Sequence, residues 1–343
     1  MLFRRRTPRT GSVSAIADFW TWWSSSRTRV RETIDAGGAE TLADELNGLV
    51  TAIHPDLQWE FARGSRSRHA LVVSPGGNPR VRVAAARWYA EAPAPDEDWE
   101  YHRCRQADPE ALSATIGIGG ERLDLGELRF GWTVNTDRHS IDVTSYHPGF
   151  ADLPDAVRGQ ITFLALDWLL GEDAVEIWIG AVAWTDTPEP DLRPPAGLTA
   201  EVRDLAATQT GEPVWALATG RDPSGAPVVA TLQVPLRSAR WPQYDTHVAV
   251  VLPYRVANEG GLPVDASLKA LRDFEDRLTA RLDVHGELVA HESSGGRRTL
   301  HYYVDGAGDA VRTVRDSVAE WREGRGAVNH TYDPEFAGVA HLS

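Results

Sequence analysis

The sequence predicts an α+β protein, with a ferredoxin-like C-terminal domain and an N-terminal region of hairpins packed on amphipathic helices. Two patterns give this prediction. Residues 246–332 follow the order strand, helix, strand, strand, helix, strand, which is the split βαβ order. The N-terminal half combines strand-like alternation of apolar and polar residues with helix-like spacing of apolar residues by three and four.

The C-terminal elements are the more regular ones. The last helix places apolar side chains on one stripe and ends before Gly324, a residue type that favours helix termination. An additional strand pair, at 215–219 and 228–234, precedes this order and extends the predicted sheet. The order itself consists of strands at 246–254, 287–293, 298–305 and 327–332 and helices at 267–282 and 309–323.

The N-terminal elements begin with an amphipathic helix from Ala39, with apolar residues up to Ile53 spaced by four and three. Residues 81–90 fit a helix or a strand equally well, because the period does not separate the two. An apolar run at 175–184 has the composition of a central strand. The other expected elements are hairpins at 57–61 with 69–74 and at 128–134 with 141–145, and a helix at 157–170.

The 343 residues suffice for more than one domain. The arginine-rich start has no apolar run of signal-peptide length, so we expect residues 1–18 to be a disordered tail rather than an export signal. The segment 186–197 is rich in proline, as stiff linkers are. We therefore predict an N-terminal region at 19–185, a linker at 186–197 and a C-terminal domain at 198–343.

Composition excludes several classes of function. The net charge is −14, from 49 acidic and 35 basic residues, which argues against a nucleic-acid partner. A single cysteine, Cys104, excludes an internal disulfide and a site built from several thiolates, and it fits the reducing cytoplasm. The longest apolar stretch, 161–170, is about half of a membrane span. We therefore expect a cytoplasmic protein without a membrane partner.

No motif indicates a cofactor or a catalytic residue, since the glycine-rich pieces lack the P-loop and dinucleotide contexts. One pattern allows a metal site. Strand alternation places His285, Glu287 and His291 on one face, where they either bind a metal or face solvent. A structural zinc needs four ligands, so the solvent-facing alternative is favoured and no metal is predicted.

Two sets of residues are candidates for binding a partner protein. The chain has 13 tryptophans, and large aromatics are enriched at interface hot spots. Three of them, Trp20, Trp22 and Trp23, lie near the N-terminus before a polar run, where a core position is less expected. The second set, Arg298, His301 and Tyr303, forms a polar hairpin face that either binds an acidic partner or is simply solvated, and the solvated alternative is favoured.

Alternation also assigns faces to the strand at 299–305. Leu300, Tyr302 and Val304 face the two helices, while His301 and Tyr303 lie on the opposite face of the sheet. That opposite face is either the site for a partner or the place where the N-terminal region docks. Internal docking is favoured, because an uncovered sheet would expose more apolar surface than small domains usually do.

The C-terminal half resembles the domain of unknown function 695 family. The resemblance covers roughly the last 130 residues. It rests on Gly261-Leu262-Pro263, Phe274-Glu275-Asp276, the run from Gly295 to Asp305, and Asp333-Pro334-Glu335-Phe336, where the family usually has tryptophan in place of Phe336. The order of elements is also similar to that of the regulators of ribonuclease activity, small acidic proteins that bind an enzyme.

The leading functional hypothesis is therefore a non-catalytic binding or regulatory protein that contacts another protein. Two alternatives stay open. One is an enzyme whose site assembles from scattered residues such as His69, Glu100 and His102. The other is an immunity or antitoxin-like protein that neutralises a basic toxin. The sequence does not determine the oligomeric state.

Overall fold

The computed structural model describes residues 11–118, 121–209 and 211–342 and confirms the α+β class. The chain divides into two compact units. Unit 1 comprises Met1–Val134 and Ser140–Asp204, and unit 2 comprises Asn135–His139 and Leu205–Ser343. Among the described helices, none is both long and apolar enough to cross a membrane.

The first part of unit 1 is a three-stranded sheet in the order β1-β2-β3, packed against helices. β1 and β2 form the expected antiparallel hairpin, and β3 runs parallel to β2 after the crossover through α3. The ambiguous segment 81–90 is thus helical. The elements are α1 (Gly11–Asp35), η1 (Ala39–Leu42), α2 (Ala43–Ile53), β1 (Gln58–Arg63), β2 (His69–Ser74), α3 (Arg82–Ala90) and β3 (Trp99–His102).

The second part of unit 1 contains a two-stranded sheet and a three-stranded sheet in the order β6-β7-β8. β8 pairs parallel to β7 after a crossover through α4 and α5. The elements are η2 (Pro109–Ser113), β4 (Thr115–Ile118), β5 (Glu121–Asp124), η3 (Leu125–Glu127), β6 (Arg129–Asn135), β7 (Ser140–Tyr146), η4 (Pro148–Asp152), α4 (Asp155–Leu170), α5 (Glu172–Trp178), β8 (Ile179–Thr185) and α6 (Pro195–Ala207).

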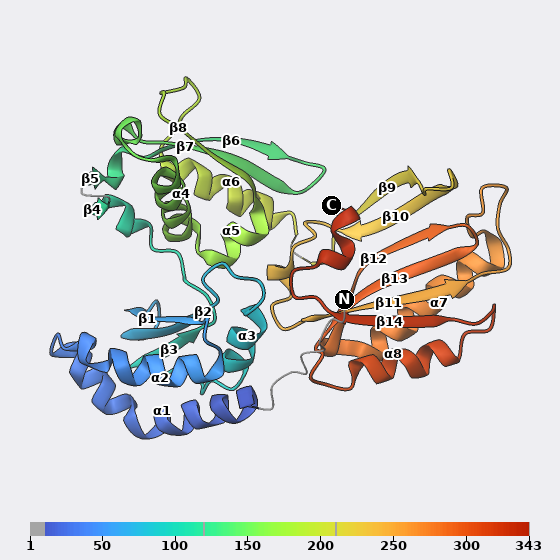
Figure 1. Cartoon of the computed structure of the whole chain (residues 1–343), viewed down its shortest axis with the longest axis horizontal. Helices are drawn as coiled ribbons and strands as arrows, with labels where there is room; N and C mark the ends of the chain where they lie inside the picture. The colour runs from blue at the N-terminus through green and yellow to red at the C-terminus, as the bar shows by residue number, and fades with distance from the viewer. Residues whose placement is uncertain (1–10, 119–120, 210, 343) are drawn as a thin grey trace, which may run out of the picture. The chain divides into compact units, whose positions relative to one another are not determined.

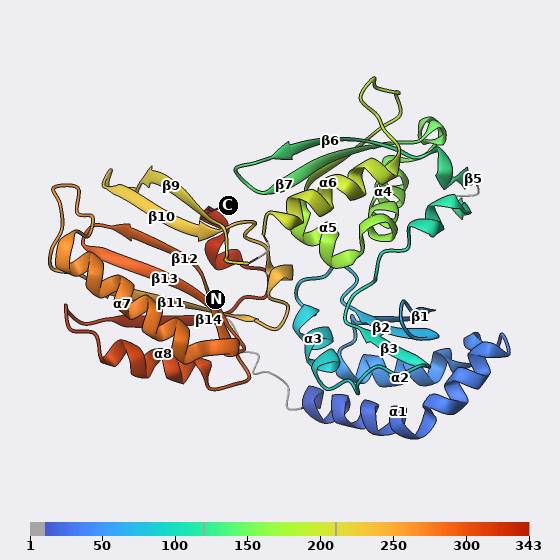
Figure 2. The same ribbon diagram turned by 180° about the vertical axis from the view of Figure 1, so that it is seen from behind.

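Unit 2 is a six-stranded sheet in the order β14-β11-β13-β12-β10-β9, with every pairing antiparallel. Helices α7 and α8 lie side by side along one face of it (Figure 1), and Figure 2 shows the same arrangement from behind. The elements are β9 (Trp215–Arg221), β10 (Pro227–Gln233), η5 (Ser238–Arg240), β11 (Thr246–Pro253), α7 (Asp265–Leu282), η6 (Asp283–His285), β12 (Gly286–Ser294), β13 (Arg297–Val304), α8 (Ala310–Ala319), β14 (Ala327–Tyr332) and η7 (Ala337–Leu342).

Two apolar layers cover this sheet, one on each face. The helix-side layer contains Leu300, Tyr302 and Val304 together with residues of α7 and α8, which confirms the predicted facing of β13. The opposite face, here called the outer face, is covered by residues 234–244 and by the C-terminal segment 333–342 of the same unit. Phe336 and Val339 of that segment are buried against Tyr303.

Two sequence predictions about elements of the N-terminal half are wrong. Residues 11–18 of the expected disordered tail belong to α1, where Ile16 is buried in the core; residues 1–10 lie outside the described part. The segment 175–184 is not one strand, because residues up to Trp178 continue helix α5, which starts with Glu172 and Asp173 in its first turn. Acidic residues favour a helix N-terminus, whereas the apolar run alone fits either element.

The predicted linker is also placed too early. The units divide between Asp204 and Leu205, inside α6 rather than at 186–197. Arg193 pairs with Phe130 through both backbone groups, and its guanidinium lies 3.4 Å from the Trp132 ring centroid. The proline-rich segment is therefore packed on β6 as part of unit 1.

Candidate functional site

The aromatic residues near the N-terminus are structural. Trp20 and Trp23 belong to the core of unit 1, and their indole N–H groups donate to the Trp88 carbonyl at 3.0 Å and to the Tyr101 hydroxyl at 2.8 Å. Trp22 is half-buried and donates to Glu45 at 2.7 Å. The prediction that this set is an interface is wrong for Trp20 and Trp23, because they belong to helix α1, which was not predicted from the sequence and which buries them in the core.

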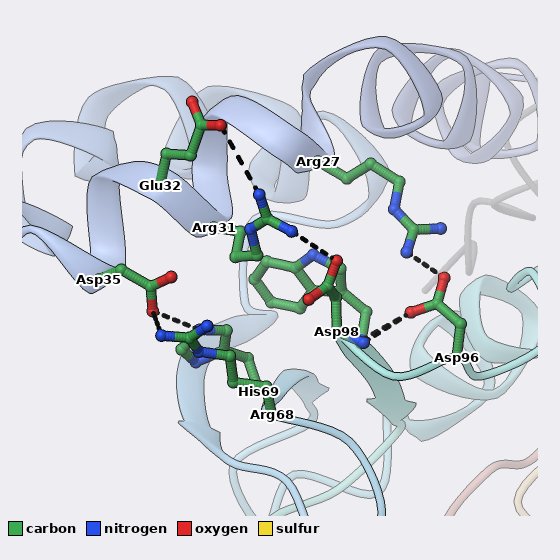
Figure 3. Close-up of polar contacts among 9 residues, drawn as sticks. Arg27, Arg31, Glu32, Asp35, Arg68, His69, Asp96 and Asp98 are labelled. Atoms are coloured by element: carbon green, nitrogen blue, oxygen red, sulfur yellow. Dashed lines mark hydrogen bonds and ion pairs between the residues drawn. The ribbon is translucent and has the colours of Figure 1, made fainter.

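The exposed side of α1 forms ion pairs with the segments around β2 and β3 (Figure 3). Arg31 contacts Asp98 at 2.8 Å, and Asp35 contacts both Arg68 and His69 at 3.0 Å. Arg27 also pairs with Asp96. These groups are matched to one another and accessible to solvent, so they position the helix rather than form an open binding site.

The residues suggested for an enzyme are likewise engaged within unit 1. The Glu100 carboxylate accepts hydrogen bonds from the backbone N–H groups of Ser65, Arg66 and Ser67, at 2.8 to 3.1 Å. Burial raises the pKa of Glu100, but these bonds and His102, 3.0 Å away, outweigh it and lower the pKa to about 2. This carboxylate therefore fixes the backbone of the loop before β2 and stays ionised near neutral pH.

A second set of carboxylates in unit 1 surrounds the start of α5. Glu172 is buried and accepts hydrogen bonds from Ser74, Gly77 and Arg105, at 2.6 to 3.1 Å. Burial and the nearby charge of Glu172 raise the pKa of Asp167 to about 6. Cys104 lies close by as a buried thiol, whose pKa burial raises to about 12, so it is protonated at neutral pH. These hydrogen bonds connect the end of β2, the loop after it and the segment before η2 with the start of α5, so the role of these carboxylates is structural.

A shallow hollow of about 280 Å³ lies beside β5, lined by Arg122, Asp124 and His147 among others. The buried His147 is held at both ring nitrogens. One contacts the Asp124 carbonyl and the other accepts from the Gly149 N–H, both at 2.9 Å. His147 therefore shapes the backbone around it.

Arg298 of unit 2 is not on a solvated face as predicted. It is buried, and its guanidinium donates to Glu275 of α7 at 2.8 Å and to Ser293 at 2.9 Å. His291 approaches the same carboxylate at 3.3 Å. The cause is the register of the hairpin, which pairs Ser293 with Arg298 on the helix side of the sheet. This arginine is compensated internally and is not available to an acidic partner.

His301 and Tyr303 do lie on the outer face, but their own unit covers them. The Tyr303 hydroxyl donates to Asp333 at 2.6 Å, and its ring stacks on Phe336 with centroids 3.5 Å apart. Burial and the Asp333 carboxylate raise the pKa of Tyr303 well above its ordinary value. The segment 333–342 therefore occupies the part of the outer face that the sequence assigned to a partner or to the N-terminal region.

The outer face carries a group of histidines that the sequence did not connect. The group consists of His247, Glu292, His301 and His341, which belong to β11, β12, β13 and η7, respectively. One ligand atom each of Glu292, His301 and His341 lie within 4.8 Å of one another, the one such triad among the described residues. His247 contacts His301 between Nε2 and Nδ1 at 3.0 Å.

The pattern at 285–291 does not form the shared face that alternation predicts. The ladder between β12 and β13 shifts between Leu288 and Ala290, so Glu287 pairs with Tyr303 while His291 pairs with Leu300. A β-bulge therefore puts Glu287 on the outer face and His291 on the helix side. The same bulge brings Glu292 to the side of His301, which simple alternation from Glu287 does not reveal.

Two of the exposed apolar residues of unit 2 lie on its edge strand β9. β9 ends the six-stranded sheet, and its side chains Trp215 and Leu217 are 40% and 71% exposed. Both lie on the helix-side face, where the described apolar layer contains residues of α7, α8 and strands β11 to β14 but none of β9 or β10. This edge of the sheet is thus open.

No protein-family model matches the chain, and no curated protein matches it. The resemblance of the C-terminal half to the domain of unknown function 695 family stays a prediction.

Proposed function

We propose that this chain is a binding or regulatory protein that acts through contacts with another protein, and that β9 receives an extended segment of that partner. The observation that carries the proposal is the exposure of Trp215 and Leu217 on a strand that ends the sheet. An edge strand offers its unpaired backbone groups as a template for a further strand. Side chains at every second position then supply the specificity.

The sequence of β9 supports this proposal. Edge strands are usually protected by lysine, proline, inward charges or bulges. β9 reads Trp-Ala-Leu-Ala-Thr-Gly-Arg, so it has no proline or lysine, and its charge, Arg221, stands at its end. The opposite edge, β14, has the polar residues Asn329, His330 and Thr331 in its centre. Of the two edges, β9 is the one with the composition of a binding strand.

The geometry also defines the partner segment. Trp215, Leu217 and Thr219 share the helix-side face, while Ala216 and Ala218 pack towards the outer-face layer. A strand paired with β9 therefore meets a large apolar surface on one face and small side chains on the other. We infer a segment with aliphatic residues at alternate positions, because these bury Leu217 and the Trp215 ring.

We further propose that β11 to β14 with α7 and α8 form a ferredoxin-like domain, to which β9 and β10 are added. The order β14-β11-β13-β12, its antiparallel pairings and the two helices on one face support this assignment. The likeness in topology to small regulators that act by binding an enzyme agrees with a partner-binding function, as an analogy of fold.

Site-specific photo-crosslinking tests the proposed edge. A benzophenone amino acid replaces, one at a time, the residues at 215, 217 and 219 in the full chain expressed in its cell of origin. Strand pairing predicts one discrete adduct, with crosslinked positions on the partner that advance by two residues for each step of two along β9. The same substitution at Val284, which is 68% exposed outside β9, serves as the control.

A matched pair of substitutions gives the second readout. Leu217→Lys places a charge on the edge and is expected to abolish the adduct at 219, whereas Val284→Lys leaves it unchanged. Adducts that map to the partner without a two-residue step, or that form equally from position 284, would contradict strand addition. A crosslink to a second copy of this chain would replace the external partner by a dimer.

A further inference from the structure

We propose that Glu292, His301 and His341 bind one divalent transition-metal ion on the outer face of unit 2, zinc by the chemistry of the ligands. Their ligand atoms lie within 4.8 Å of one another. Two imidazoles and one carboxylate are a ligand set that zinc accepts, with water in the fourth position. This proposal depends on no feature of β9.

Two distances between ligand atoms describe the site without an ion. The His301 Nε2 atom is 3.4 Å from one oxygen of Glu292, and the His341 Nε2 atom is 3.6 Å from the other. Zinc holds such ligands at about 2.1 Å. His301 is fixed by burial, whereas the His341 side chain is 53% exposed, so the solvent side of His341 leaves it room to turn towards an ion.

His247 provides the orientation that metal-bound histidines require. Its Nε2 atom is 3.0 Å from His301 Nδ1, and the two rings stack with an angle of 8° between them. A histidine that binds metal through Nε2 donates its Nδ1–H to an acceptor, which fixes the ring and its tautomer. The Nε2 atom of His247 is therefore placed as the acceptor of that bond.

The ligands come from three separate elements, β12, β13 and η7, which gives the ion a mechanical role. Glu292 and His301 belong to the sheet, and His341 belongs to the segment that covers it. A bound ion would therefore fasten the end of this segment, beyond the contacts of Tyr303 with Asp333 and Phe336. Metal binding should stabilise the covered state of the outer face.

Calorimetric titration of the untagged, metal-free full chain with zinc tests the site. We expect one ion per chain and a higher melting temperature with zinc. His341→Ala and Glu292→Gln should each abolish measurable binding, while His247→Phe should weaken it by about 10- to 100-fold and leave one site. His285→Ala removes an exposed histidine outside the triad and should change nothing.

Cobalt substitution gives a readout of the metal ligands themselves, which a residue with a purely structural role would not change. Co²⁺ in place of zinc should give the visible absorption of a four-coordinate site, and this spectrum should be lost in His341→Ala, whose exposed position leaves folding intact. The proposal is overturned if the wild type binds neither ion, or if His341→Ala and His285→Ala bind them equally well. Loss of crosslinking at β9 has no bearing on either result.

Discussion

The two units cover a sheet in different ways. In unit 1, one long regular helix, α1, packs Trp23 against β3 and Phe19 against α3, and places its charged residues outside. In unit 2, the outer face is covered by irregular segments that combine a small number of buried apolar side chains with polar contacts such as that of Tyr303 with Asp333. The difference teaches that a regular helix distributes its attachment over many apolar contacts, whereas a short segment relies on a few polar and aromatic anchors.

The largest expected effect comes from the core side of α1. Trp23→Ala should lower the free energy of unfolding of unit 1 by about 3 to 5 kcal/mol, because it leaves a cavity and removes the bond to Tyr101. Denaturant unfolding followed by circular dichroism measures this loss. Trp22→Ala, at the half-buried neighbour, is the control and should cost clearly less; equal losses would refute the assignment of Trp23 to the core.

A smaller effect is expected on the outer face of unit 2. Tyr303→Phe keeps the ring on Phe336 but removes the hydroxyl that donates to Asp333, which should cost about 1 to 3 kcal/mol. Hydrogen exchange should then become faster at the Ala337 and Gly338 amides, which also donate to Asp333. Unchanged exchange there, with a lower melting temperature, would show that the loss lies elsewhere in the sheet.

The smallest effect is expected at the exposed ion pairs of α1. Arg31→Gln breaks the contact with Asp98 but should change the stability of unit 1 by less than about 1 kcal/mol, because solvent screens such pairs. The same unfolding experiment in low and high salt measures it. A loss as large as that of Trp23→Ala would mean that α1 is held mainly by charge, and the contrast drawn between the two coverings would fail.

The sequence predicted the regular parts of this molecule well. The six elements from β11 to β14 appear in the expected order, and Leu300, Tyr302 and Val304 face the helices as alternation requires. Periodicity identifies such elements because one face of each is buried throughout its length. It failed for the whole of α1, where polar and small residues interrupt the apolar pattern, and for residues 175–178, which suit a helix or a strand equally.

The candidate sites were less accessible to sequence reasoning. Arg298 is predicted to be solvated, but Glu275 lies 23 positions away along the chain and becomes its partner only after folding. His341 joins His301 because the C-terminal segment folds back on the sheet, and no spacing rule reports that contact. The exposed edge of β9 likewise depends on the strand order of the whole sheet, although the strand itself is predicted correctly.

Because of the bulge in β12, the face on which its side chains lie depends on the number of residues in the strand as well as on their identity. Val289 is the extra residue in the shifted ladder, and it divides the strand into two halves with opposite facing. Deletion of Val289 would restore regular alternation, and every residue of β12 after it would then point to the opposite face of the sheet. Glu292 would then turn under the helices and His291 would turn outward. A deletion of three nucleotides could thus dismantle the arrangement while every ligand remained in the sequence.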